Sequence, residues 1–117
     1  MDKRRQLPVI FFPASQTQER THWLPSVDVY RIRSGWLLKF DLAGVAPEDI
    51  EVDVAGCRIT VRGVRRDCIE EEVDAYYSME IAYNRFERTI ELPCRFDHPS
   101  VAIESRNGIL IVRLTEA

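Results

Sequence analysis

The fold is decided by two stretches of the chain, WLLKFDLAG at residues 36–44 and IEVDVAGCRITVRG at residues 50–63. In both stretches apolar and polar side chains alternate, and alternation places every second side chain on the same face of an extended strand. We therefore expect half-buried strands, with one face toward a core and the other toward solvent. The predicted inward residues are Trp36, Leu38, Phe40, Leu42, Ile50, Val52, Val54, Ile59 and Val61.

Two further strands are predicted near the C-terminus. Val101 and Ile103 alternate with other residues, whereas residues 109–114 are apolar on both faces over most of their length, a pattern typical of a central strand. Turn signals stand at Ala55-Gly56-Cys57 and at Asn107-Gly108. No window longer than about ten residues has the 3.6-residue period of a helix. Several short strands joined by regular turns predict an all-β fold, either a sandwich or a small barrel.

One predicted strand changes parity within its length. The alternate apolar residues of 79–83 share one face, and those of 86–92 share the other. We expect a β-bulge at Asn84 to cause the switch, because asparagine tolerates the backbone angles that a bulge requires. Arg88 then lies on an apolar face, and since burial of a lone charge is costly, Arg88 is expected to have a partner.

The first 22 residues differ from the rest and follow neither a helical nor a strand period. We expect a flexible arm over residues 1–22 and one domain over residues 23–117, because the length of the chain fits a single domain. The apolar segment 7–13 is too short for a secretory signal or a membrane span. Its adjacent phenylalanines, Phe11 and Phe12, predict an interaction of some kind.

Charge and cysteine content argue against several classes of protein. The net charge of −3 provides no positive field for phosphates, so nucleic acid is not expected as a partner. Cys57, Cys68 and Cys94 are an odd number without ligand spacing, which indicates reduced thiols, a cytoplasmic location and no zinc site. Neither a phosphate-binding loop nor a nucleophile motif is present, so we expect no cofactor and no enzymatic activity.

The alternation fails between residues 64 and 77, where the chain is first charged and then aromatic. A connection of this length in a small domain usually has a function. We interpret the acidic run Glu70-Glu71-Glu72 as a solvated part of this loop rather than as a site. For Cys68 two interpretations stay open, an incidental surface thiol and a redox switch between subunits.

Four motifs in the right order resemble those of the small heat-shock proteins, the α-crystallin domain family. They are WLPSVDVY at 23–30, DLAGVAPEDI at 41–50, EIAYNRFER at 80–88 with Leu92-Pro93 after it, and NGIL at 107–110. The resemblance covers residues 23–115, nearly the whole chain. Departures from the family pattern include Ala43 in place of proline and Asn84 in place of glycine.

The resemblance implies an immunoglobulin-like β-sandwich that binds unfolding proteins without hydrolysing ATP and assembles from homodimers into oligomers. In the bacterial and plant branch of the family, a long loop carries a strand that pairs with the partner subunit. Here that loop would be residues 64–77, with contacts at Cys68, Ile69, Val73, Tyr76 and Tyr77. Arg88 matches an arginine of the family, and its partner is expected to be a carboxylate of the same or the facing subunit, with Glu80 as one candidate.

The family also has an apolar groove at the sandwich edge, into which a C-terminal I-x-I/V motif docks and joins dimers. This sequence stops at Ala117 without that motif, which argues against large assemblies and leaves both a homodimer and a larger oligomer open. We hypothesise that Leu7-Pro8-Val9 replaces it, because two apolar anchors flank a proline that favours an extended chain. The predicted groove residues are Ile50, Val52, Val54, Val101 and Ile103, with a core position as the alternative for each, and the predicted arm residues that bind clients are Leu7, Val9, Phe11 and Phe12.

Two other functions compete with this one. A co-chaperone or scaffold module of the CS-domain type would share the sandwich and bind one folded partner, but that type lacks the long loop. A secreted adhesion-like sandwich is disfavoured by the odd cysteine count and the missing signal peptide.

Overall fold

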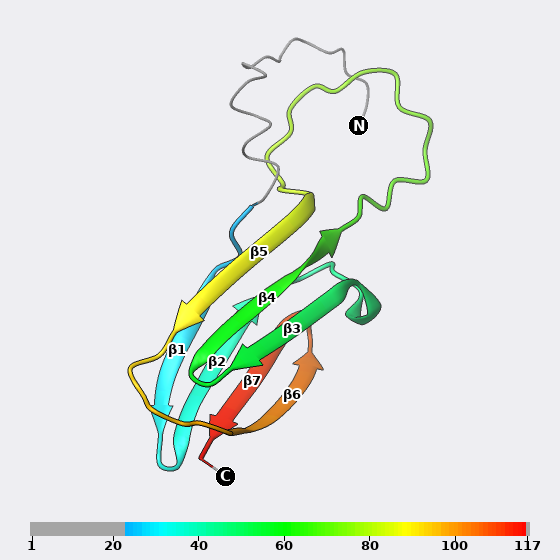
Figure 1. Ribbon diagram of the computed structural model, residues 1–117. Coiled ribbons are helices and arrows are strands. Elements are labelled where there is room, and N and C mark those ends of the chain that lie inside the picture. Colours follow the sequence, from blue (N-terminus) through cyan, green and yellow to red (C-terminus); the bar gives the residue numbers. More distant parts are fainter. Residues whose placement is uncertain (1–22, 117) are drawn as a thin grey trace.

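The computed structural model describes residues 23–116, which form two antiparallel sheets packed face to face (Figure 1). One sheet has the order β1-β2-β7-β6 and the other the order β3-β4-β5. The all-β fold predicted from the alternation is thereby confirmed, and it is the sandwich that the resemblance implied rather than a small barrel. The strands are β1 (Val27–Ile32), β2 (Gly35–Asp41), β3 (Ile50–Ala55), β4 (Arg58–Arg65), β5 (Asn84–Glu91), β6 (Ser100–Arg106) and β7 (Ile109–Thr115).

The core lies between the two sheets and receives every second side chain from the inner strands. β7 pairs with β2 on one side and with β6 on the other, as its apolar sequence predicts. Burial of apolar side chains from both sheets is what holds the layers together, at about 25 cal/mol per Å² removed from water. The buried apolar residues are Leu38, Phe40, Leu42, Ile59, Val61, Phe86, Leu92, Leu110, Val112 and Leu114.

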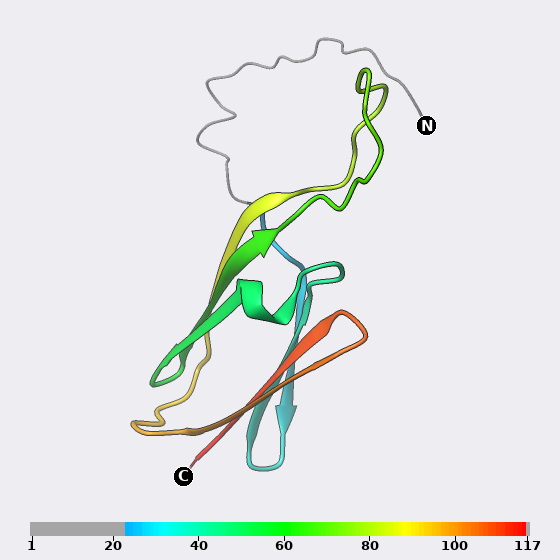
Figure 2. The same cartoon turned by 90° about the vertical axis from the view of Figure 1, so that its right-hand side faces the viewer.

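The edge strands of the two sheets lie on two opposite sides of the sandwich. β3 and β6 both lie on the right-hand side of the sandwich in Figure 1, the side that Figure 2 turns toward the viewer. On the other side, β5 lies against the chain that leads into β1. There the backbone N–H of Trp23 donates to the carbonyl of Arg85 at 3.0 Å, and the Trp23 ring lies 5.2 Å from that of Phe86.

The predicted turns are present, and both contain residues with positive φ angles. In the β3–β4 turn Gly56 has a φ of 61°. Asn107 and Gly108 join β6 to β7 with φ angles of 52° and 82°, in the region that favours asparagine and glycine. A short 3₁₀ turn, Pro47–Asp49, leads from β2 into β3 and so connects the sheets. It is the one helical element that the structure describes in residues 23–116.

The change of parity near Asn84 marks the start of a strand and not a bulge within one. β5 begins at Asn84, and residues 79–83 lie in the loop before it, so the expected continuous strand over 79–92 is wrong. Asn84 has a φ of 74°, which turns the chain from the loop into the sheet. Its carbonyl accepts a hydrogen bond from Nε1 of Trp23 at 3.2 Å.

Two of the cysteines form a disulfide, so the expectation of reduced thiols is wrong for them. Cys57 lies in the β3–β4 turn and Cys94 in the segment after β5, and their Cα atoms are 6.0 Å apart. The β4–β5 pairing places Arg58 opposite Glu91, which brings these two distant positions to the same end of the sandwich. The predicted cytoplasmic location depended on reduced thiols and loses that support. Cys68 is a free, exposed thiol in the long loop.

The disulfide should contribute measurably to stability, because it joins positions 37 residues apart and restricts the unfolded chain. Replacing both partners, in Cys57→Ser/Cys94→Ser, is expected to lower the free energy of unfolding by about 2–4 kcal/mol. Denaturant unfolding measures this difference. Cys68→Ser is the matched control and should unfold like the natural chain. If a reductant left the natural chain as stable as before, this role of the disulfide would be refuted.

Candidate functional site

The five predicted groove residues are on the two edge strands that meet on one side of the sandwich. Ile50, Val52 and Val54 alternate with exposed residues along β3, are half-buried, and pack against the core. On β6, Val101 is 39% exposed and Ile103 is 49% exposed. β3 pairs with β4 alone and β6 with β7 alone within residues 23–116. We call these five residues the apolar edge set.

The long loop comprises residues 66–83 and contains no strand. Figures 1 and 2 show it projecting beyond the ends of β4 and β5, away from the sandwich. The exposed large apolar residues of the loop are Ile69, Val73, Tyr76, Tyr77, Met79 and Ile81. A series of solvent-facing apolar side chains on one segment is typical of an interaction surface.

Arg65, the last residue of β4, fixes the base of this loop. Its Nε donates to the carbonyl of Ala43 at 3.0 Å, and its Nη1 donates to the carbonyl of Ala82 at 2.9 Å. Its guanidinium carbon lies 4.1 Å from the centre of the Trp23 ring, a cation–π contact. The sequence analysis did not assign this role. The available signal was the pair of arginines at the end of a predicted strand, directly before the loop.

Arg66 makes a second anchor, with a carboxylate at the start of β3. Its Nε and Nη2 donate to the two oxygens of Asp49 at 3.0 and 3.1 Å, a paired arrangement that only arginine provides. These hydrogen bonds lower the pKa of Asp49, slight desolvation opposes the shift, and the positive charge of Arg66 adds to it. The loop is therefore tied to the sandwich by charge-assisted contacts at its first residue.

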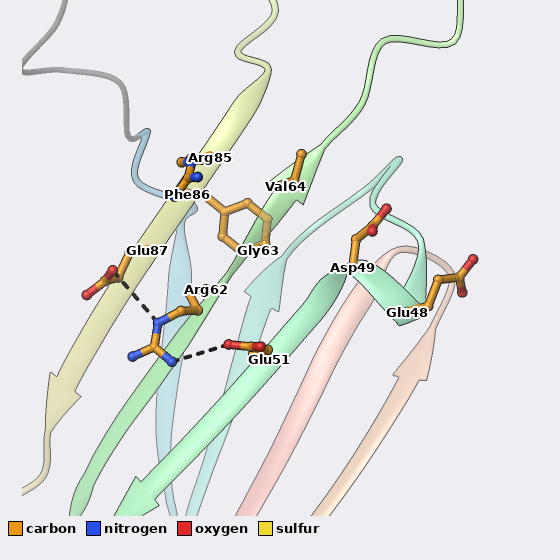
Figure 3. A pocket seen from close by; sticks show the side chains of 9 residues that line it. All are labelled: Glu48, Asp49, Glu51, Arg62, Gly63, Val64, Arg85, Phe86 and Glu87. Atoms are coloured by element: carbon orange, nitrogen blue, oxygen red, sulfur yellow. Dashed lines mark hydrogen bonds and ion pairs between the residues drawn. The ribbon is translucent and has the colours of Figure 1, made fainter.

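The other carboxylates near Asp49 gather around one arginine. Figure 3 shows an open cleft of about 300 Å³, in which Arg62 extends between Glu51 and Glu87. Arg62 Nη1 also donates to Asp53 at 3.2 Å, and that hydrogen bond is the main reason that the pKa of Arg62 is raised. A guanidinium surrounded by three carboxylates forms a structural network across β3, β4 and β5.

Arg88 is half-buried on the inner face of β5, as its parity predicts. Its Nη1 donates to the backbone carbonyl of Pro25 at 2.8 Å, so the partner that this structure gives it is a carbonyl. Within residues 23–116 no ion pair joins Arg88 to Glu80, which is exposed in the loop. A carboxylate of the facing subunit stays a prediction.

The arm residues Leu7, Val9, Phe11 and Phe12 lie outside the described residues. Among residues 23–116, no group of three or more His, Cys, Asp or Glu side chains is arranged to hold a metal ion. Within the same part of the chain, no helix is long and apolar enough to cross a membrane.

Comparison with known families gives one match over most of the chain. The sequence profile of the Hsp20/alpha crystallin family matches residues 28–117. The chain belongs to this family. This match confirms the resemblance found in the motifs.

Individual members of the family are also similar. Spore protein SP21 of Stigmatella aurantiaca is 33% identical over 79% of this chain, and small heat shock protein C2 of Rickettsia felis is 28% identical over 88% of it. The matches cover 54% and 66% of those two proteins' own lengths. Heat shock protein 16.0 of Schizosaccharomyces pombe superposes with a TM-score of 0.68 at 25% identity, over 82% of this chain and 89% of that one.

The fold alone is also shared with HSP18.5 of E. histolytica, which superposes with a TM-score of 0.70 at 24% identity over 80% of this chain and 88% of that one.

The Asp49–Arg66 contact should make stability depend on pH in the acid range. The pKa of Asp49 is lowered in the folded state, so the contact contributes stability above the pKa of the unfolded carboxyl, about 3.9, and loses it as pH falls through the lowered value. Asp49→Asn is therefore expected to lower the Tm at pH 7, and the difference from the natural chain should shrink below about pH 4.

Thermal unfolding of both proteins between pH 3 and pH 7 measures this dependence. Glu48→Gln is the matched control, because the neighbouring carboxylate makes no recorded hydrogen bond within residues 23–116. A Tm difference for Asp49→Asn that is as large at pH 3 as at pH 7 would contradict the assignment.

Proposed function

We propose that this chain is an ATP-independent holdase, which binds unfolding proteins and prevents their aggregation while working as a dimer or a higher oligomer. The observation that carries the proposal is the apolar edge set on β3 and β6, with Val101 and Ile103 partly exposed. Unfolding proteins expose apolar segments and strand edges, and an open sheet edge binds such segments through its backbone and its side-chain pockets. Membership of the Hsp20/alpha crystallin family supports the same function.

β-strand addition explains why this edge suits clients of many sequences. The backbone groups on the outer side of β6 have no strand partner within residues 23–116, and backbone hydrogen bonds do not depend on the client's sequence. Side chains at alternate positions of a bound segment would contact the apolar edge set, which adds affinity for apolar clients. Leu7-Pro8-Val9 of the arm has the same spacing and is proposed as an internal occupant.

The long loop supports a dimer rather than a monomeric scaffold. Its exposed residues Tyr76 and Tyr77 need a surface to cover them, and β1 is an edge strand with Val29 and Tyr30 exposed. A loop segment that adds to β1 of a second copy would close that edge. A module of the CS-domain type, which binds one folded partner, lacks such a loop.

The deciding measurement is light scattering from a heat-labile client without ATP, with and without the full chain at equimolar subunits. We expect suppression, and expect added ATP to leave it unchanged. In Val101→Ser/Ile103→Ser, the amount of chain needed for half-maximal suppression should rise about fivefold, the change that corresponds to about 1 kcal/mol of lost apolar contact.

Leu24→Ser is the matched control, because Leu24 is as apolar and exposed but lies outside both edge strands. It should suppress scattering like the natural chain. Phe11→Ser/Phe12→Ser tests the arm in the same assay. No suppression by the natural chain, together with a monomer by size, would reject the holdase and favour the scaffold with one partner.

A further inference from the structure

An arginine-lined cleft lies at one end of the sandwich. No role has been assigned to this cleft above. It has a volume of about 570 Å³ and is formed by the β1–β2 hairpin, the segment after β5 and the C-terminal end of the described chain. Three cations and one carboxylate face it. Its main lining residues are Arg31, Arg33, Trp36, Arg95, Phe96 and Glu116.

The arginines of this cleft are available to bind an anion. Within residues 23–116 no ion pair joins Arg31, Arg33 or Arg95 to a carboxylate. Five arginines elsewhere in the same part of the chain do have a carboxylate partner: Arg58, Arg62, Arg66, Arg106 and Arg113. The guanidinium carbon of Arg31 lies 5.1 Å from the centre of the Trp36 ring. Stacking of this kind holds the guanidinium in place and leaves its N–H edge free for a carboxylate.

The acidic partner is present in the same sequence. Residues 67–80 of the loop contain six carboxylates and no basic residue. The whole chain carries −3 and this segment carries −6, so the rest of the chain carries +3. Six like charges on one exposed loop repel one another, and a cluster of guanidinium groups relieves that repulsion.

The two charged regions of one molecule cannot meet. Figures 1 and 2 both show the loop at one end of the sandwich and the β1–β2 hairpin at the opposite end. We propose that the acidic segment Glu70–Asp74 of one copy binds in the arginine-lined cleft of a second copy, and that the second copy returns the same contact. This proposal rests on the dimer proposed above and names the residues that select the partner.

The surroundings of the cleft fit a loop as occupant. β1 ends at Ile32, directly beside the cleft, and its exposed Val29 and Tyr30 lie next along the same edge. In the loop the apolar Ile69 and Val73 flank the acidic run. An extended segment can therefore place carboxylates among the arginines while its apolar residues cover the edge of β1.

A charge exchange tests the contact on the full chain. Arg33→Glu/Arg95→Glu reverses the cleft, and Glu70→Lys/Glu71→Lys/Glu72→Lys reverses the loop. Each variant alone should self-associate with a Kd about tenfold higher at low salt, and the difference should shrink at high salt, because exposed charges are screened. An equimolar mixture of the two should associate like the natural chain, since both contacts of the mixed dimer then join opposite charges.

Sedimentation equilibrium measures these constants, and circular dichroism verifies that the variants fold. Arg58→Glu/Arg106→Glu is the matched control, because it reverses two arginines whose carboxylate partners lie within their own chain, and its Kd should not change. The proposal is overturned if the mixture associates no better than either variant. It is also overturned if the cleft variant loses client suppression with an unchanged Kd, which would assign the cleft to clients.

The client assay separates this proposal from the function it rests on. If the natural chain suppresses scattering but the charge exchange does not change the Kd, the holdase function is supported and the loop contact is rejected. If the mixture restores the Kd but the natural chain does not suppress scattering, the loop contact is supported and the holdase function is rejected.

Discussion

A sandwich of two open sheets buries its faces but cannot bury its edges, and the surface of this protein follows from that constraint. The alternate side chains of β2, β4, β5 and β7 fill the space between the layers. Four edge strands remain, β1 and β6 on one sheet and β3 and β5 on the other. Each exposes backbone donors and acceptors, which in an ordinary domain are a hazard for aggregation.

The edges at β5, β3 and β6 differ in what covers them. The edge at β5 is partly closed by the chain before β1, where Trp23 binds the backbone of β5 and Pro25 accepts the hydrogen bond of Arg88. The edges at β3 and β6 carry apolar side chains and have no cover within residues 23–116. Exposed apolar side chains and unpaired backbone groups promote aggregation, and the same groups can bind the exposed segments of unfolding proteins.

The sequence predicted what depends on local periodicity and missed what depends on distant segments. Residues such as Leu38 and Val61 were assignable because a strand repeats every two residues and one face must be buried. The order of the sheets, and with it the proximity of β3 to β6, followed only from the family resemblance. The groove residues could therefore be named from the resemblance. The exposure of Ile103 could not be predicted, because a two-residue period does not distinguish a buried apolar position from an exposed one.

The two corrections have the same origin. A change of parity is compatible with a bulge or with the start of a strand, and only the φ of Asn84 and its contact with Trp23 decide between them. Cys57 and Cys94 carry no signature of pairing in the sequence, since the register of β4 against β5 brings them together. The anchors Arg65 and Arg66 belong to the same class, because their partners are remote carbonyls and a remote carboxylate.

The position of the disulfide has a covalent consequence for the long loop. The bond between Cys57 and Cys94 closes a ring of chain that contains all of residues 66–83. A protease attacks exposed, irregular segments first, and here that segment lies inside the ring. A single cut between Cys68 and Ile81 therefore opens the ring without separating the molecule into two pieces. The nicked protein stays one covalent molecule, heavier by one water, and keeps both halves of its core until a reductant separates them.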